Sequence, residues 1–380
     1  MRSSIDRLRD YVAIPSVNPM GRSDIPAEWT GERRYAERVR DDLRSIGLDA
    51  ALVGAGERTS VVAEARVPGA HETVLVASHL DTVPVDAMTI DPFDPRIEAG
   101  RLQGRGSCDT KGGMAALVAA LERLLARGAL RRSVVVVGEA DEELGGRGVD
   151  DVLAHLGGSR PDWALATEPT GLEIVTHHKG IAVLRLEASG VAAHGSRPEA
   201  GRSAIVELSR AVLALEALRP EFAKRPDPVL GPASCSVGVI GGGKAPNVVP
   251  DSAWLLLDRR LLPGEGAEDV TREIEQALER ASIHHVSVSN CWMGKPPLAI
   301  AATHAAVLAC RAALSAAGLR DALGVAAFGT DAASLAARGI PALVMGPGSV
   351  EQAHTADEWV EVAQVEAMER FFERLLGSDA

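Results

Sequence analysis

The sequence predicts an α/β fold in which a mostly parallel sheet, with helices on both faces, carries an inserted α+β domain. Three observations support this prediction. The chain has 380 residues, more than one hydrophobic core usually serves. Short apolar strands alternate with long helical stretches towards both ends of the chain, which is typical of a parallel sheet covered by helices. In the middle the expected order changes to β-α-β-β-α-β, which is typical of a compact two-layer unit.

We expect residues 1–177 and 291–380 to form the outer, discontinuous domain. Its main helix carries Leu117, Leu121 and Leu124 on one face and is stopped by Gly128. The four consecutive valines at 134–137 do not alternate with polar residues, which indicates an interior strand buried on both faces. The expected strands are residues 60–66, 73–78, 133–138, 163–167 and 341–346, and the expected helices are residues 112–128, 302–317 and 331–338.

The inserted domain is expected at residues 178–290. Three stretches of it are read as strands, and two helices are expected to join them. The strands are residues 180–190, 234–243 and 252–260, and the helices lie near residues 201–218 and 265–281.

The composition excludes several classes of partner. Only 3% of the residues are aromatic and the net charge is -12, which argues against a nucleic-acid-binding protein. No apolar run approaches the ~18 residues that a membrane span needs, and the first residues lack the apolar core of a signal peptide. The four cysteines are scattered, as reduced thiols usually are. We therefore expect a cytoplasmic protein with no membrane or nucleic-acid partner.

Polar residues with metal-ligand chemistry come after nearly every predicted strand of the outer domain. Ligand sites of open α/β sheets gather at the carboxyl ends of the strands. Each motif is weak alone: a histidine in "HLD" often caps a surface turn, and an aspartate before a helix is often an N-cap. The glycine-rich loop "GRGSCDTKGG" lacks the order of a phosphate-binding loop. The residues in question are His79 and Asp81, Asp109, the acids of "EADEELGG", Glu168 and His354.

Together, five of these residues satisfy the ligand count of a two-metal site. Asp109 is expected to bridge the two metals, with His79 and Glu168 on one metal and Glu143 and His354 on the other. This set of nitrogen and oxygen ligands suits Zn²⁺, with Co²⁺ or Mn²⁺ as substitutes.

Two further residues are left for catalysis and support. Glu142, next to a ligand, is expected to act as the general base that takes a proton from water and passes it to a leaving amine. Asp81 is expected to hold the second nitrogen of the His79 ring. Asp141 and Glu139 are interpreted as turn or supporting groups. The predicted chemistry is the hydrolysis of an amide.

The chain resembles, over nearly its whole length, the zinc metallopeptidase and deacylase family of acetylornithine deacetylase, succinyl-diaminopimelate desuccinylase, aminoacylase and glutamate carboxypeptidase. This resemblance implies a di-zinc exopeptidase-like fold with two zinc ions per subunit, a ferredoxin-like lid and dimerisation domain at residues 178–290, and a cis peptide bond after Asp109. The motifs that carry it are "SHLDTVP", "GRGSCDTKGGMAA", "DEELGG", "TEPT", "AAHGSRPEAGRSAI", "NVVPDSAWLLLDRRLLPGE", "FGTDAA", and "GPG" followed by "AHTADE".

The resemblance also implies contacts with the substrate. His194 would stabilise the oxyanion of the tetrahedral intermediate, often from the second subunit of a homodimer. Its residue context alone indicates only a loop histidine. Arg260 could instead pair with Asp258, the glycines could form only a tight turn, and the acid after Thr330 could simply start a helix. The implied substrate-binding residues are Asn247, Arg260, Thr330, Gly346 and Gly348.

The expected substrate is an N-acyl amino acid. Glu168, rather than aspartate, is the form that resembles the family's carboxypeptidases and deacylases. A glutamate-carboxypeptidase-like or dipeptidase activity is the alternative, and a non-catalytic binding protein is a remote one, because all five ligands and the base are present. The loop at residues 16–32 is expected to be surface structure, although Trp29 could form a wall of the substrate site.

Overall fold

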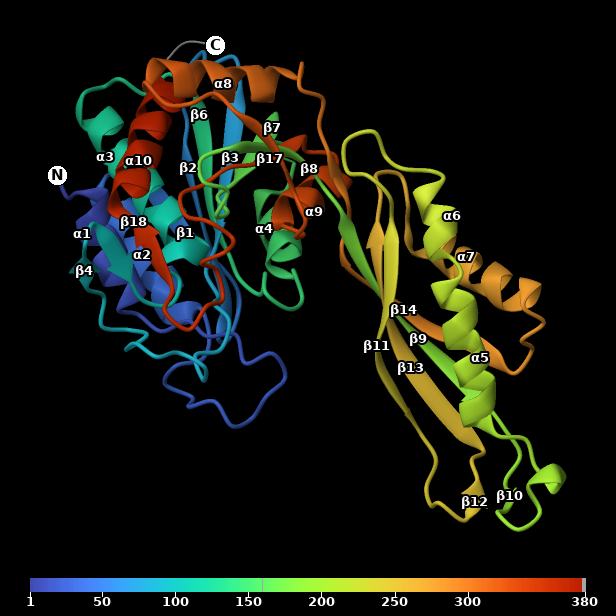
Figure 1. Cartoon of the computed structure of the whole chain (residues 1–380). Helices are drawn as coiled ribbons and strands as arrows, with labels where there is room; N and C mark the ends of the chain where they lie inside the picture. The colour runs from blue at the N-terminus through green and yellow to red at the C-terminus, as the bar shows by residue number, and fades with distance from the viewer. Residues whose placement is uncertain (159, 378–380) are drawn as a thin grey trace. The chain divides into compact units, whose positions relative to one another are not determined.

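The computed structural model describes residues 1–158 and 160–377, which form two compact units (Figure 1). The first unit comprises Met1–Thr176, Ile300–Gly324 and the described residues from Thr330 onward. The second comprises His177–Ala299 with Val325–Gly329. Its boundary therefore lies at residue 299 and not at the expected residue 290, because one strand of this unit, β14 (Val286–Lys295), runs straight through that position.

The sheet of the first unit is parallel at its centre. Its strands lie in the order β1-β2-β6-β3-β7-β17-β8; β8 and β16 continue into the second unit, to which β15, paired with His177 and His178 of β8, belongs. The four strands from β6 to β17 pair in parallel, whereas β1, β2 and β8 add antiparallel edges. The strands are β1 (Asp49–Ala55), β2 (Arg58–Ala65), β3 (Thr73–His79), β6 (Ser133–Glu139), β7 (Trp163–Ala166), β8 (Ile174–His178), β15 (Leu298–Ala299), β16 (Leu323–Ala326) and β17 (Ala342–Val344).

Helices cover both faces of this sheet, as predicted. One face packs against α1 (Ser4–Val12), α2 (Arg33–Ser45), α3 (Gly112–Ala126), α8 (Ala305–Ala316) and α10 (Val362–Gly377). The other face carries α4 (Gly148–Leu156) and α9 (Asp331–Ala337). A small antiparallel sheet accompanies them, with the strand order β18 (Trp359–Glu361), β5 (Arg101–Gln103) and β4 (Ile97–Glu98).

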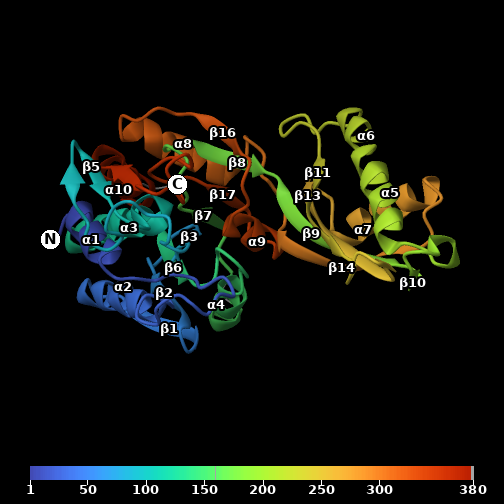
Figure 2. The ribbon, with the colours of Figure 1, turned by 60° about the horizontal axis from the view of Figure 1, so that its bottom comes forward.

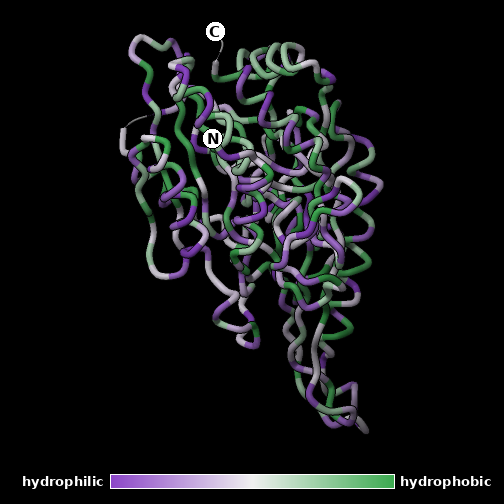
Figure 3. The backbone as a smooth tube through the Cα atoms, turned by 90° about the vertical axis from the view of Figure 1, so that its left-hand side faces the viewer, coloured by the Kyte–Doolittle hydropathy of each residue, from purple (hydrophilic) through white to green (hydrophobic). Residues whose placement is uncertain are grey.

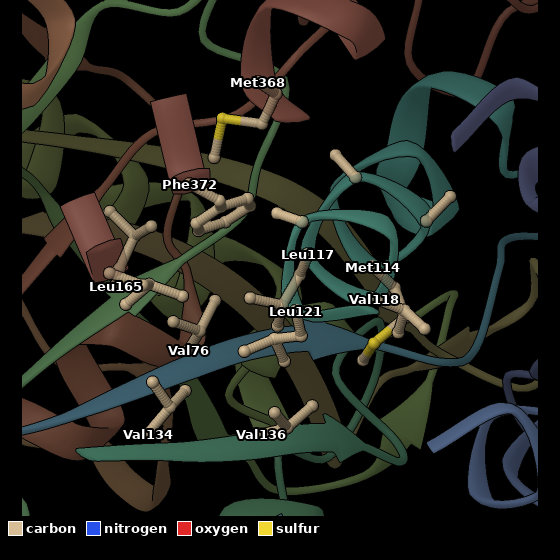
Figure 4. Packing of buried hydrophobic residues seen from close by; sticks show 14 of the residues in the cluster. Val76, Met114, Leu117, Val118, Leu121, Val134, Val136, Leu165, Met368 and Phe372 are labelled. Atoms are coloured by element: carbon tan, nitrogen blue, oxygen red, sulfur yellow. The ribbon is translucent and has the colours of Figure 1, made fainter. Parts of the chain in front are cut away.

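The valine run of β6 lies between these two helical layers, which explains its lack of alternation. Val134 and Val136 belong to the same cluster as Leu117 of α3 and Phe372 of α10 (Figure 4). Val135 and Val137 point to the opposite face, and all four valines are at most 3% exposed. Full burial of a valine side chain contributes about 1.5–3 kcal/mol. The prediction of an interior strand is confirmed.

The second unit is an α+β layer pair. Its antiparallel sheet has the order β11-β13-β9-β14, and α5, α6 and α7 lie on one side of it in both views (Figures 1 and 2). Along the chain, the long elements have the predicted β-α-β-β-α-β order. They are β9 (Gly180–Ser189), α5 (Ala204–Glu216), α6 (Arg219–Ala223), β11 (Ser234–Gly242), β13 (Ser252–Leu261), α7 (Ala267–Arg280) and β14, with the short pair β10 (Ala193–His194) and β12 (Val248–Val249).

Hydrophobic residues are distributed in short stretches throughout the chain. Figure 3 shows these stretches interrupted by hydrophilic residues. Among residues 1–158 and 160–377, no helix combines the length and the apolar character that crossing a membrane requires.

Candidate metal centre

Five candidate ligands converge at the carboxyl edge of the parallel strands. His79 is the last residue of β3, Glu143 comes after β6, and Glu168 comes after β7. Because these strands are neighbours and run in the same direction, their carboxyl ends meet at one edge. Asp109 lies in the segment Ser107–Lys111 just before α3, where its own backbone is not helical, and His354 lies in the turn before β18.

The inner set consists of His79, Asp109 and Glu168. The three ligand atoms lie within 4.8 Å of one another. His79 Nε2 is 2.9 Å from Asp109 Oδ1 and 3.8 Å from Glu168 Oε2. The His79 side chain is only 1% exposed. This set is therefore almost closed to solvent.

The outer set consists of Asp109, Glu143 and His354, whose ligand atoms also lie within 4.8 Å of one another. His354 Nε2 is 3.2 Å from Asp109 Oδ2 and 3.2 Å from Glu143 Oε1. Asp109 thus turns one oxygen to each set, in the way that a bridging ligand would. It does not cap α3, because the residue before that helix is Lys111. The His354 side chain is 50% exposed, so this set is open to solvent.

The acids of the two sets are crowded enough to perturb one another. Burial, with the nearby Asp109 charge, raises the pKa of Glu143 to about 7. Burial and the charges of Asp109 and Glu142 also raise the pKa of Glu168. Hydrogen bonds to Asp109 and Glu143 raise the pKa of His354 to about 10. These raised pKa values show that the site lacks positive charge to balance its carboxylates. Its nitrogen and oxygen donors fit a pair of divalent metal ions.

Asp81 contacts His79 differently from the way expected. His79 Nδ1 lies 2.9 Å from the backbone carbonyl oxygen of Asp81 and 3.6 Å from its carboxylate. The carboxylate accepts hydrogen bonds from the amides of Glu142 and Glu143 instead, both at 3.0 Å. The carbonyl of Asp81 therefore orients the histidine, and its side chain holds the turn that carries the expected base.

Glu358 holds the loop that carries Asp109. Its Oε1 accepts hydrogen bonds from the amides of Gly106, Cys108 and Asp109 at 2.9–3.1 Å, and its Oε2 accepts from Arg105 Nη1 at 2.7 Å. The carboxylate is fully buried. The Asp109–Thr110 peptide bond in this loop is cis, as the resemblance implied. Sequence reasoning gave Glu358 no role, although an acid that closes the motif "AHTADE" was the available signal.

The loop at residues 16–32 is not simply surface structure. Its middle is exposed, but Asn18 and Glu32 are each only 4% exposed. Trp29 packs edge-on against Phe93, with 5.7 Å between ring centroids. The buried ends of this loop contact the turn at Asp141, which sequence reasoning missed.

The predicted residues of the inserted domain lie in two separate places within the second unit. His194 is exposed on β10, pairs with Val248 of β12, and therefore lies next to Asn247. Arg260 lies towards the other end of β13, where its Nε is 2.9 Å from Asp258 Oδ1, the ion pair considered as its alternative role. β13 has 10 residues, so it spans roughly 33 Å.

The glycine turn does not offer the free amides that were expected. The Gly346 amide donates to Thr170 Oγ1 at 3.1 Å, and the Gly348 amide donates to Gln364 Oε1 at 2.7 Å. Gly346 is required for packing, because a Cβ atom there would lie 2.5 Å from the Glu168 carbonyl oxygen. Thr330 is 1% exposed and directly precedes α9, so it presents little surface to a ligand. These contacts do not support the expected roles of the three residues in substrate binding.

The fold and the two ligand sets define a metal-dependent hydrolase, and the comparisons with known proteins agree. Residues 75–378 match the family described as Peptidase family M20/M25/M40. The chain belongs to this family. It is 32% identical to an acetylornithine deacetylase from Myxococcus xanthus over 92% of this chain and 88% of that protein. It is 27% identical to a succinyl-diaminopimelate desuccinylase from Corynebacterium glutamicum over 96% of each chain.

Solved structures show the same fold. An M20 family metallo-carboxypeptidase from Sulfolobus solfataricus is similar with a TM-score of 0.78, at 20% identity over 99% of both chains. A dinuclear metal-binding peptidase of the M20 family from Bacillus subtilis is similar with a TM-score of 0.73, at 16% identity over 98% of this chain and 96% of that one. The predicted fold class and family are thereby confirmed.

Proposed function

We propose that the chain is a zinc-dependent deacylase that cleaves the amide bond of an N-acyl amino acid, with Glu142 as the general base. The observation that carries this proposal is the pair of ligand sets that share Asp109, with Glu142 immediately before a ligand of the outer set. The similarity to a deacetylase and a desuccinylase, both named for removing an acyl group, supports the substrate class.

The residues of the chain have distinct roles in this reaction. His79, Asp109, Glu168, Glu143 and His354 would hold two metal ions. When bound, these ions polarise the scissile carbonyl and lower the pKa of the attacking water. Glu142 accepts a proton from that water and delivers it to the leaving amine nitrogen. The Asp81 carboxylate accepts a hydrogen bond from the Glu142 amide and thereby keeps the backbone of Glu142 in place.

The second unit would supply the substrate contacts from two copies of the chain. His194 and Asn247 lie beyond the start of β13, and Arg260 lies near its end, roughly 30 Å along the strand. One amino-acid substrate cannot bridge that distance. In a homodimer, Arg260 of one chain can bind the substrate carboxylate while His194 of the other stabilises the oxyanion.

The surface of the second unit fits such a dimer. β11 is an edge strand, with Val239 and Ile240 46% and 55% exposed. Ile205, Val206 and Leu213 of α5 are also exposed, Leu213 at 73%. Exposed edge strands and apolar patches are common sites of association. Light scattering tests this part of the proposal, and a monomer in solution at micromolar concentration would contradict it.

Zinc and a cytoplasmic location complete the proposal. Histidine nitrogens and carboxylate oxygens are ligands that zinc prefers, and elemental analysis of the purified protein checks the metal. The cysteines Cys108, Cys235, Cys291 and Cys310 are all free thiols, which fits a reducing compartment. Fractionation of the native cells checks the location.

Replacement of the base gives the decisive test. Glu142→Gln removes the proton acceptor but keeps the shape, so kcat is expected to fall by roughly 10²–10⁴-fold with two metals still bound. Glu351→Gln, an exposed acid near His354, is the matched control and should keep wild-type turnover. The assay uses a panel of N-acyl amino acids and dipeptides. Wild-type turnover by Glu142→Gln would refute the mechanism, and cleavage of dipeptides alone would indicate a peptidase.

A further inference from the structure

We infer that Asn18 is a positioning residue for the general base, acting through the carboxylate of Asp81. The inference rests on the proposed role of Glu142. It concerns a segment about 120 residues before the base in the chain, at the amino-terminal end of the first unit. Three features carry it: the pairing of that segment with the residues after β3, the hydrogen bonds of the Asn18 side chain, and the hydrogen bonds of Asp81.

The segment at residues 16–18 runs alongside the residues that come after β3. Val17 forms a parallel bridge with Thr82. The Asn18 amide donates to the Thr82 carbonyl at 2.8 Å, and the Thr82 amide donates to the Ser16 carbonyl at 3.0 Å. Because Pro19 is the next residue, Asn18 is restricted to extended conformations. This register places the Asn18 side chain next to Asp81.

Each polar atom of the Asn18 side chain is engaged. Its Nδ2 donates to Asp81 Oδ2 at 2.9 Å and lies 3.3 Å from Asp141 Oδ1. Its Oδ1 accepts the amide of Met20 at 3.0 Å. The amide group therefore stands between two buried carboxylates with its orientation fixed by a backbone donor. A carboxylate cannot replace it there, because it has no hydrogen to donate.

Asp81 connects Asn18 to the backbone of the proposed base, Glu142. Its Oδ1 accepts the amide of Glu142, and its Oδ2 accepts both the amide of Glu143 and Asn18 Nδ2. The carboxylate is only 1% exposed, and these three hydrogen bonds hold it in place, so that it fixes the backbone of the two glutamates.

The other end of the loop at residues 16–32 also contacts the turn at Asp141. Glu32 Oε1 accepts the amide of Asp141 at 3.1 Å. Asp141 has a positive φ of 66°, a conformation that a residue other than glycine rarely adopts without local support. Asn18 and Glu32 therefore hold the turn that leads into Glu142 from two directions.

The test compares Asn18→Asp and Asn18→Ala with Asp24→Asn. Asn18→Asp keeps the shape but sets a carboxylate against Asp81 and Asp141, whereas Asn18→Ala removes both the donor to Asp81 and the acceptor of the Met20 amide without adding a charge. Asp24 lies in the same loop, exposed and paired with Arg22, and serves as the matched control. We expect kcat to fall roughly 10–100-fold in both Asn18 variants, with KM and a metal content of about two ions unchanged. Asp24→Asn should match the wild type.

Two outcomes would overturn the inference. A kcat within about twofold of wild type in Asn18→Asp would show that the hydrogen bond is unnecessary, since shape alone would then suffice. A fall in kcat matched by loss of metal, measured by elemental analysis, would assign Asn18 to metal retention instead. If Asn18→Asp folds poorly in a thermal unfolding assay, Asn18→Ala, which introduces no charge, is judged by the same two measurements.

The double variant separates this inference from the proposed function. On the Glu142→Gln background, Asn18→Asp should cause no further fall in residual turnover, because the group it positions is gone. An equal fall on both backgrounds would overturn the inference and leave the role of Glu142 intact. Wild-type turnover by Glu142→Gln alone would instead refute the proposed function.

Discussion

The two ligand sets share Asp109 but are built in opposite ways. The inner set comes from the ends of buried strands, and His79 is almost fully enclosed. The outer set comes from turns, and His354 is half exposed and has a positive φ of 61°. Strand ends are placed by the sheet itself, whereas turns need separate support. The outer set accordingly depends on Asp81 and on the amino-terminal segment, which hold the turn before Glu143.

The largest loss of metal and of activity is expected when Asp109, the residue that the two sets share, is replaced. Asp109→Ala removes a ligand from both, so both metals and all turnover should be lost. Elemental analysis after gel filtration measures the metal content. If Asp109→Ala retained one tightly bound metal, one of the two sets would bind its metal without Asp109, and the two sets would not depend on a shared ligand.

The next largest effect is expected when either set loses its histidine ligand, and its size should differ between the inner set and the outer set. His354→Ala removes a half-exposed side chain, so it should lose one metal and lower the free energy of unfolding of the metal-free protein by less than His79→Ala does. His79→Ala should also lose one metal but destabilise by about 1–3 kcal/mol, because it empties a buried position. Urea unfolding in chelator measures both. Equal destabilisation would contradict the difference in burial.

The smallest effect on activity concerns the support of the outer set. Burial, aided by the charge of Asp81, raises the pKa of Glu32 to about 8. A folded pKa above the unfolded value means that the stabilising contribution is complete below about pH 4.5 and is lost as the pH rises through 8. Glu32→Gln keeps an oxygen for the Asp141 amide and does not titrate.

The wild type should therefore lose stability between pH 5 and 9 relative to Glu32→Gln, by an amount on the order of a few kcal/mol. Urea unfolding of the metal-free proteins across this range measures the difference, with turnover at neutral pH nearly unchanged. If the free energies of unfolding of the wild type and of Glu32→Gln changed in parallel with pH, the pKa of Glu32 would be unperturbed in the folded state.

Strand order made the core of the metal centre predictable from the sequence. His79, Glu143 and Glu168 could be brought together because parallel strands end at the same edge. The boundary at residue 290 was wrong because the β14 stretch, "VSVSNCWMGK", mixes polar and apolar residues too irregularly to indicate a long strand.

Contacts between distant residues could not be predicted. Asn18 and Asp81 are 63 positions apart, and Glu358 and Cys108 are 250 positions apart. Gly346 and Gly348 were assigned to the substrate, but their amides donate to Thr170 and Gln364. A pattern of residue types shows that a carboxylate or an amide is present, but it does not show which distant group is its hydrogen-bond partner.

The dependence of the Asp109 loop on Glu358 has a consequence for synthesis on the ribosome. The chain emerges from its amino terminus, so His79 and Asp109 leave the exit tunnel long before His354 and Glu358. Until then, three loop amides lack their acceptor and the outer set lacks its histidine. A nascent or truncated chain therefore cannot assemble the paired site, and the outer set can bind its metal only after nearly complete translation.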